Sequence, residues 1–132
     1  MELQATEGVR VLVIDDSNTI RRSAELYLRQ GGCEVTLAED GFDALAKVID
    51  FQPGIIFIDI LMPRLDGYQT CALIKKHPKY SGTPIVMLSS KDGLFDRVRG
   101  RLVGSDQYLT KPFTKEELLK AVTEHVLQRA SA

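Results

Sequence analysis

The sequence lacks any excess of charge, any long apolar run and any recognisable leader. Its 17 Lys and Arg residues balance 18 Asp and Glu residues, which leaves a net charge of -1. This balance gives no electrostatic reason to expect nucleic acid or an anionic membrane as a partner. No apolar segment approaches the roughly 20 residues of a membrane span, and the first ten residues have no basic or apolar signal region. We therefore expect a soluble cytoplasmic protein without membrane insertion.

Cysteine motifs and the common catalytic motifs are also missing. The two cysteines, Cys33 and Cys71, form no paired motif. Two buried thiols in a reducing compartment are the preferred interpretation, and a single disulfide stays open as the alternative. The glycine-rich motifs of P-loop and dinucleotide sites are absent, as is the G-x-S-x-G motif of serine hydrolases. Neither His77 nor His125 follows a predicted strand, so we expect neither to be catalytic.

What the sequence does contain is a regular alternation of strand and helix patterns. With 132 residues, 44% of them hydrophobic, the chain suits one domain with a substantial core. The predicted strands cover 11–14, 33–38, 54–59, 83–90 and 105–111, and the predicted helices cover 17–30, 40–51, 64–78, 92–104 and 114–130. The strands are apolar without alternation, which is typical of a parallel sheet with helices on both faces. Five β-α repeats predict an α/β sandwich with right-handed crossovers.

Each predicted helix carries apolar side chains at helical spacing that we expect to face the core. They are Ile20, Ala24, Tyr27 and Leu28; Phe42, Leu45, Val48 and Ile49; Leu65, Tyr68, Ala72 and Leu73; Leu94, Val98 and Leu102; and Leu118, Val122, Val126 and Leu127. Thr114 and Glu117 fit a capping box at the start of the last helix. We expect a disordered tail over 1–8, one domain over 9–128 and a short tail over 129–132, with no room for a second domain.

Polar side chains gather where the predicted strands end. The first strand ends in Asp15 and Asp16, the third in Asp59, the fourth in Ser89 and the fifth in Lys111. Ligands of open parallel sheets bind beyond these carboxyl ends. Clustered carboxylates repel one another, and a bound cation such as Mg²⁺ (or Mn²⁺) relieves that repulsion. The cation and the lysine together would neutralise a phosphoryl group, and the serine hydroxyl would donate a hydrogen bond to it.

Asp59 is the expected nucleophile, because it ends the central strand and a carboxylate can form an aspartyl-phosphate. Simpler roles remain for its neighbours. Asp15 is an alternative cap for the following helix, although Ser17 is as good a cap. Ser89 and Lys111 have the alternative of being an ordinary loop hydroxyl and a solvated lysine.

Taken together, the motifs resemble the receiver domain of two-component response regulators. The resemblance is carried by Asp15-Asp16, by "DILMPRLDG" from Asp59, by Ser89-Ser90 and by "YLTKPF", which contains Lys111. It covers roughly residues 8–128, with 43 residues from Asp16 to Asp59 and 52 from Asp59 to Lys111. It implies a flavodoxin-like (βα)5 fold whose strand order is 2-1-3-4-5. Within the family, the chain closely resembles the stand-alone response regulators of type IV pilus chemosensory systems.

The resemblance implies a role for each site residue. Asp59 accepts a phosphoryl group from the phosphohistidine of a chemosensory-type histidine kinase. Asp16 binds the metal directly, Asp15 acts through water or shapes the pocket, and the backbone carbonyl of Leu61 completes the protein's share of the ligands. Lys111 and Ser89 bind the phosphoryl oxygens. A cis bond is implied before Pro112.

Three further positions concern switching and phosphate lifetime. Tyr108 is the implied switch aromatic, with a half-buried strand tyrosine as the alternative. Leu61 and Lys91 occupy the two positions that tune phosphate lifetime in the family. Neither is an acid or an amide that positions water, so we expect self-hydrolysis that is not fast.

The resemblance also implies how the signal leaves the domain. Phosphorylation would change the surface formed by residues 94–101, Tyr108 and 115–120, and a pilus motor or an adaptor protein would then bind. The expected outcome is control of pilus extension and twitching motility. Two alternatives stay open: an intermediate phosphate carrier, and a Mg²⁺-dependent aspartyl-phosphate phosphatase. Such phosphatases place an acid where this chain has Leu61, so we expect a switch with at most self-phosphorylation and self-dephosphorylation activity.

Overall fold

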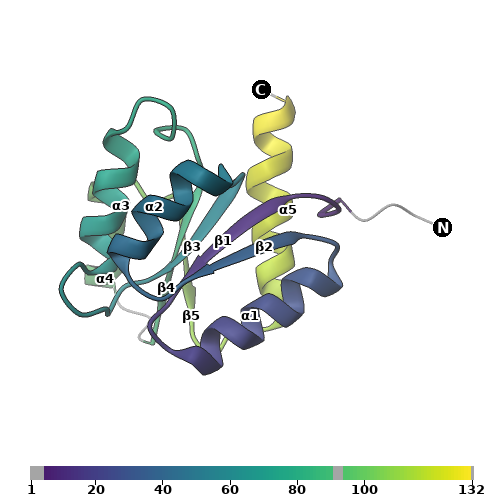
Figure 1. Ribbon diagram of the computed structural model, residues 1–132, viewed down its shortest axis with the longest axis horizontal. Coiled ribbons are helices and arrows are strands. Elements are labelled where there is room, and N and C mark those ends of the chain that lie inside the picture. The colour runs from purple at the N-terminus through teal and green to yellow at the C-terminus, as the bar shows by residue number, and fades with distance from the viewer. Residues whose placement is uncertain (1–4, 91–93, 132) are drawn as a thin grey trace.

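A computed structural model describes residues 5–90 and 94–131 of the protein. Five parallel strands form one sheet in the order β2-β1-β3-β4-β5, and this confirms the predicted α/β class and strand order. The elements are β1 (Arg10–Ile14), α1 (Asn18–Gln30), β2 (Glu34–Ala38), α2 (Gly41–Phe51), β3 (Ile55–Asp59), α3 (Gly67–Lys76), β4 (Ile85–Ser89), α4 (Leu94–Leu102), β5 (Gln107–Thr110) and α5 (Lys115–Ser131). Helices cover both faces of the sheet (Figure 1).

Two apolar clusters hold the three layers together. On one face, Val11 and Phe57 of the sheet pack with Leu28 of α1 and Leu118 of α5. On the other face, side chains of the same strands pack with α2 and α3. Strands β3 and β4 are buried along their whole length, because both faces are covered and both edges are paired. This burial explains why their sequences are apolar without alternation.

The helix faces differ from the predicted ones in α2, α3 and α4. Phe42 and Ile49 are 55% and 58% exposed, and α2 instead buries Gly41 and Ala44 beside the predicted Val48. Small residues there allow a close approach, since a Cβ on Gly41 would lie 2.4 Å from Thr70 Oγ1 of α3. Leu73 of α3 is 44% exposed, while Val98 and Leu102 of α4 are 48% and 81% exposed. The side chains of Leu94 and Leu127 lie outside the described residues. The remaining predicted face residues are buried or half-buried.

Helix ends follow the sequence closely. Ser17 caps α1 and Asp66 closes a capping box on α3. The predicted box of Thr114 and Glu117 is confirmed, with each residue's side chain accepting from the other's amide at 3.1 and 2.9 Å. Residues 5–8, within the predicted tail, form a turn docked on the end of α1, where the Gly8 amide donates to the Gly32 carbonyl. Helix α5 continues to Ser131, past the predicted domain limit.

Both cysteines are free and buried, as predicted. Burial raises the pKa of Cys33 to about 11 and that of Cys71 to about 12, so both thiols stay protonated at neutral pH. Among the described residues, no helix has the length and apolar character needed to cross a membrane.

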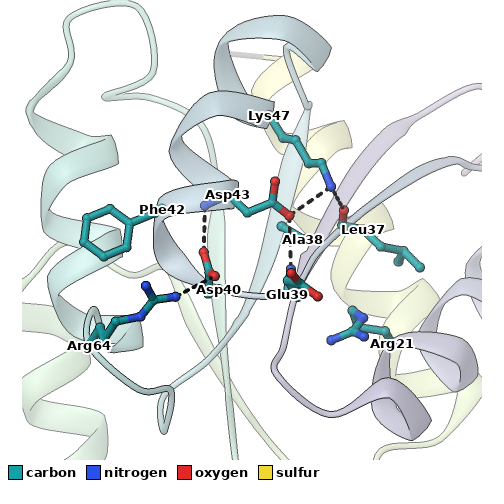
Figure 2. A pocket seen from close by; sticks show the side chains of 9 residues that line it. All are labelled: Arg21, Leu37, Ala38, Glu39, Asp40, Phe42, Asp43, Lys47 and Arg64. Atoms are coloured by element: carbon teal, nitrogen blue, oxygen red, sulfur yellow. Dashed lines mark hydrogen bonds and ion pairs between the residues drawn. The ribbon is translucent and has the colours of Figure 1, made fainter.

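Two basic side chains, Arg29 and Lys47, bind the outward-facing carbonyls of the edge strand β2. The Glu34 amide donates to the Val9 carbonyl and the Asp15 amide donates to the Ala38 carbonyl, so by the alternation of a parallel strand the carbonyls of Val35 and Leu37 point away from the sheet. Arg29 of α1 donates to the Val35 carbonyl at 3.2 Å, and Lys47 of α2 donates to the Leu37 carbonyl at 2.6 Å (Figure 2). An edge strand with open carbonyls is a template for pairing with another chain.

We expect the double substitution Arg29→Met and Lys47→Met to cause concentration-dependent self-association. Methionine keeps an apolar stem but leaves both outer carbonyls open. Each lost hydrogen bond should also lower the free energy of unfolding by about 1 kcal/mol. Sedimentation velocity over a range of concentrations measures the association. The control is Arg22→Met with Lys120→Met, which removes the same charge from exposed positions on α1 and α5. Equal self-association of both double variants would contradict the role of Arg29 and Lys47 in protecting the edge strand.

Candidate functional site

Three carboxylates meet at the carboxyl edge of the sheet. Asp15 and Asp16 follow β1, Asp59 ends the neighbouring strand β3, and one oxygen from each lies within 4.8 Å of the others. Asp15 and Asp59 are 0% and 4% exposed, whereas Asp16 is exposed. The structure thus brings together the three acids that the sequence predicts at the carboxyl ends of the strands.

Lys111 supplies a positive charge inside this cluster. Its Nζ lies 3.0 Å from Asp59 Oδ1 and 3.2 Å from Asp15 Oδ2, and its side chain is 16% exposed. Because β4 lies between β3 and β5, the long side chain spans the end of β4 to reach the acids. The peptide bond between Lys111 and Pro112 is cis, as the sequence resemblance implied.

Burial and like charge act on the ionisation of this cluster. Burial, together with the charge of Asp15, raises the pKa of Asp59 to about 6, although Lys111 opposes the rise. Burial alone would lower the pKa of Lys111, but its contacts with Asp59 and Asp15 outweigh burial and raise it. The ammonium therefore stays charged, while Asp59 is held closer to its neutral form than an ordinary aspartate.

Backbone contacts fix the position of Asp15. Its Oδ1 accepts a hydrogen bond from the Ser17 amide at 2.9 Å, and its carbonyl accepts from Arg21 Nη1 at 2.5 Å. Ser17 is the cap of α1, so the alternative in which Asp15 caps that helix is not needed. Sequence reasoning missed Arg21, because a lysine or arginine in a first helical turn carries no signal for such a contact.

A glycine brings α3 directly against the end of β3. A Cβ on Gly67 would lie 2.3 Å from the carbonyl oxygen of Asp59 and 2.8 Å from the Cα of Ile60. The Gly67 amide donates to the Ile60 carbonyl at 2.9 Å. The first turn of α3 thus supports the backbone that presents Asp59. Sequence analysis gave this glycine no role, although its place after the cap Asp66 was a usable signal.

Three of the remaining predicted residues lie on or just after strands β3, β4 and β5. Ser89 is buried at the end of β4, and its carbonyl accepts from the Lys111 amide at 2.6 Å. Tyr108 is half-buried on β5, paired with Met87 in register, and packs on the α2–α3 side of the sheet. Leu61 follows β3 with its side chain 70% exposed. Lys91 lies outside the described residues.

The donor set of the cluster fits a hard divalent cation. It offers carboxylate oxygens and no nitrogen or sulfur ligand, and Mg²⁺ prefers oxygen. The pKa of Asp59 is raised first by burial and then by the charge of Asp15, and a cation would relieve this repulsion. Asp15, Asp16 and Asp59 are therefore the residues suited to hold it.

Comparison with known proteins gives a consistent match. The family model described as response regulator receiver domain matches residues 11–123. Protein PilG of Pseudomonas aeruginosa is 66% identical over 123 residues, which cover 93% of this chain and 91% of that protein. Response regulator MprA of Mycobacterium sp. strain KMS is 39% identical over 93% of this chain, which spans about half (52%) of the MprA length.

Solved structures agree with the fold. Chemotaxis protein CheY4 of Vibrio cholerae superposes with a TM-score of 0.84 at 35% identity, covering 92% of this chain and 98% of that one. The receiver domain of the Francisella response regulator 1452 superposes with a TM-score of 0.85 at 33% identity, covering 92% and 99% of the two chains. The similarity thus extends over nearly the whole described chain.

Proposed function

Because this chain belongs to the response regulator receiver domain family, we propose that Asp59 accepts a phosphoryl group from the phosphohistidine of a chemosensory-type kinase. The observation that carries the proposal is the pairing of a buried strand-end carboxylate with Lys111, beside two further acids. An Asp59 oxygen forms the bond to phosphorus as the phosphorus–nitrogen bond breaks, and the imidazole nitrogen keeps the electron pair.

The neighbouring residues have separate tasks in this proposal. Lys111 moves from its carboxylate partners to the phosphoryl oxygens, and the Ser89 hydroxyl donates a hydrogen bond to one of them. Asp16 and Asp59, with the backbone carbonyl of Leu61, would hold Mg²⁺ or Mn²⁺ directly, and Asp15 would act through water or by shaping the pocket. When bound, the cation supplies charge neutralisation for the transferred group.

Phosphorylation then changes the surface and so the binding of a partner. In this proposal Tyr108 follows Ser89, and the change reaches α4, β5 and α5. The exposed Val98 and Leu102 on α4 support a docking role for this face. The likeness to PilG over 91% of that protein's length favours output through the receiver surface itself. We place the protein in a cytoplasmic chemosensory pathway whose pilus motor or adaptor controls twitching motility.

The same proposal covers the phosphate lifetime and the choice between a switch, a phosphatase and a phosphate carrier. Leu61 and Lys91 act as tuning positions that do not position water, so self-hydrolysis of the phosphate is not fast. The protein acts as a switch and not as a phosphatase, because the exposed Leu61 side chain near Asp59 has no proton to donate. A phosphate carrier remains the second candidate, since carriers and terminal switches share the same family site.

Labelling with acetyl phosphate and Mg²⁺ tests the function. We expect one acid-stable, hydroxylamine-labile phosphate, located at Asp59 by borohydride reduction and mass spectrometry. Chelation of the metal should abolish the label. Rapid turnover of phosphate esters would support a phosphatase, and a label on another residue would overturn the assignment of Asp59.

A further inference from the structure

The loop between β3 and α3 has an unusual backbone at its exposed tip. Arg64 has a φ of 66°, in the left-handed region that a residue with a side chain adopts only when other contacts hold it. The Leu65 amide donates to the Pro63 carbonyl at 2.8 Å, which closes a three-residue turn around Arg64. The same loop carries Leu61, which lies three residues before Arg64.

The base of this loop is fixed by the sheet and by α3. The Ile60 amide donates to the Leu88 carbonyl at 3.1 Å, and the Ile60 carbonyl accepts from the Gly67 amide at 2.9 Å. Ile60 and Met62 are buried, whereas Leu61 and Arg64 are exposed. Ile60 and Met62 thus anchor the first part of the loop in the core, and the exposed Arg64 side chain adds a contact at the tip.

Arg64 makes such a contact with the start of α2. Its Nη2 lies 3.2 Å from Asp40 Oδ2, and its Cζ lies 5.7 Å from the centre of the Phe42 ring (Figure 2). The Asp40 side chain is 18% exposed, and its other oxygen, Oδ1, accepts from the Asp43 amide at 2.7 Å. Asp40 thus uses one oxygen to cap α2 and the other to bind the loop.

We propose that Arg64 is a positioning residue whose ion pair with Asp40 holds the β3–α3 loop so that the Leu61 carbonyl is available to the cation. This inference rests on the proposed function for the role of Leu61. The pairing of Arg64 with Asp40 and Phe42 forms what we term the loop clasp. The clasp ties the loop to the start of α2.

The variants distinguish loss of the ion pair between Arg64 and Asp40 from loss of the Asp40 cap on α2. Asp40→Asn keeps a side-chain oxygen for the cap but removes the charge that binds Arg64. Arg64→Ala removes the guanidinium, and Arg64→Lys keeps the charge. Arg10→Ala is the matched control, because Arg10 also stacks on an aromatic ring, Phe51 at 4.5 Å, and pairs with a carboxylate, Glu34 at 3.8 Å, away from the site.

Two readouts are measured for every variant. Titration calorimetry gives the Mg²⁺ dissociation constant, and hydrogen exchange of residues 60–66 in cation-free protein gives the mobility of the loop. We expect Asp40→Asn and Arg64→Ala each to raise the dissociation constant about three- to tenfold and to speed loop exchange. The double variant should be no worse than either single variant, because both remove one interaction. Arg64→Lys should recover most of the affinity, and Arg10→Ala should match the wild type.

The outcomes distinguish this inference from the proposed function. Unchanged loop exchange and Mg²⁺ affinity in Arg64→Ala, or additive losses in the double variant, would overturn the clasp while the wild type still binds Mg²⁺ and takes phosphate. A wild-type protein that binds no Mg²⁺ and takes no phosphate would overturn the proposed function instead.

Discussion

Asp59→Asn is expected to abolish labelling by acetyl phosphate and, without a divalent cation, to raise the free energy of unfolding at neutral pH. The amide is a poor nucleophile, which explains the first effect. The second follows from the buried position of Asp59, 3.0 Å from Lys111 and beside Asp15. Asparagine keeps an oxygen that accepts from Lys111 but carries no charge to repel Asp15. The carboxylate of Asp59 is thus expected to serve phosphorylation while it lowers the free energy of unfolding.

The stability gain should depend on pH with a defined sign. Burial raises the pKa of Asp59 from 3.8 to about 6, so the folded state binds this proton more tightly than the unfolded state. The wild type therefore loses stability as the pH rises from about 4 through 6, and the variant does not. One unit of pKa corresponds to about 1.4 kcal/mol, so we expect a gain of roughly 1–3 kcal/mol at pH 7 that disappears near pH 4.

Urea unfolding between pH 4 and 8, with a chelator present, measures this gain. Asp50→Asn is the control, since it removes the same charge from an exposed position at the end of α2. Added Mg²⁺ should reverse the order by stabilising the wild type. An Asp59→Asn variant less stable than the wild type at pH 7 without cation would show that Lys111 outweighs the repulsion.

The strand pattern and the strand-end acids could be predicted because each has a local cause. A strand covered on both faces must be apolar throughout, as Ile55–Asp59 is except for its last residue. Parallel strands then place their last residues at one edge, which is why Asp15, Asp59 and Lys111 meet. These deductions need only the order of the elements.

Helix orientation and long-range polar contacts could not be predicted, because their causes lie in other elements. Periodicity placed Phe42 and Ile49 on the inner face of α2, but the fit of Gly41 against Thr70 selects a neighbouring face. The contact between Arg64 and Asp40 joins residues 24 positions apart, and no pattern in either segment indicates it. The backbone contact that makes Gly67 necessary is likewise made with β3 and not within its own helix.

Gly67→Ala is expected to be strongly destabilising and to slow phosphorylation. The new Cβ would lie 2.3 Å from the Asp59 carbonyl oxygen and 2.8 Å from the Ile60 Cα, both backbone atoms that cannot rotate away. Helix α3 or the end of β3 must therefore move. Overpacking of this kind typically costs about 1–3 kcal/mol, and sometimes more. A displaced phosphoacceptor can lower a reaction rate by about 100-fold, so labelling should slow by one to two orders of magnitude.

Gly54→Ala is the control, because it makes the same chemical change at a position where the added Cβ meets no steric conflict. At Gly54 a Cβ meets its nearest backbone atom, the Arg10 carbonyl oxygen, at an ordinary 3.7 Å. Glycine-to-alanine changes without a steric conflict generally stabilise, because alanine restricts the unfolded chain. Urea unfolding and the acetyl phosphate labelling rate should therefore show a loss in both quantities for Gly67→Ala. For Gly54→Ala we expect an equal or slightly higher free energy of unfolding and an unchanged labelling rate. Equal stability and equal labelling in the two variants would mean that α3 has room to retreat from Asp59, and that the site does not depend on this contact.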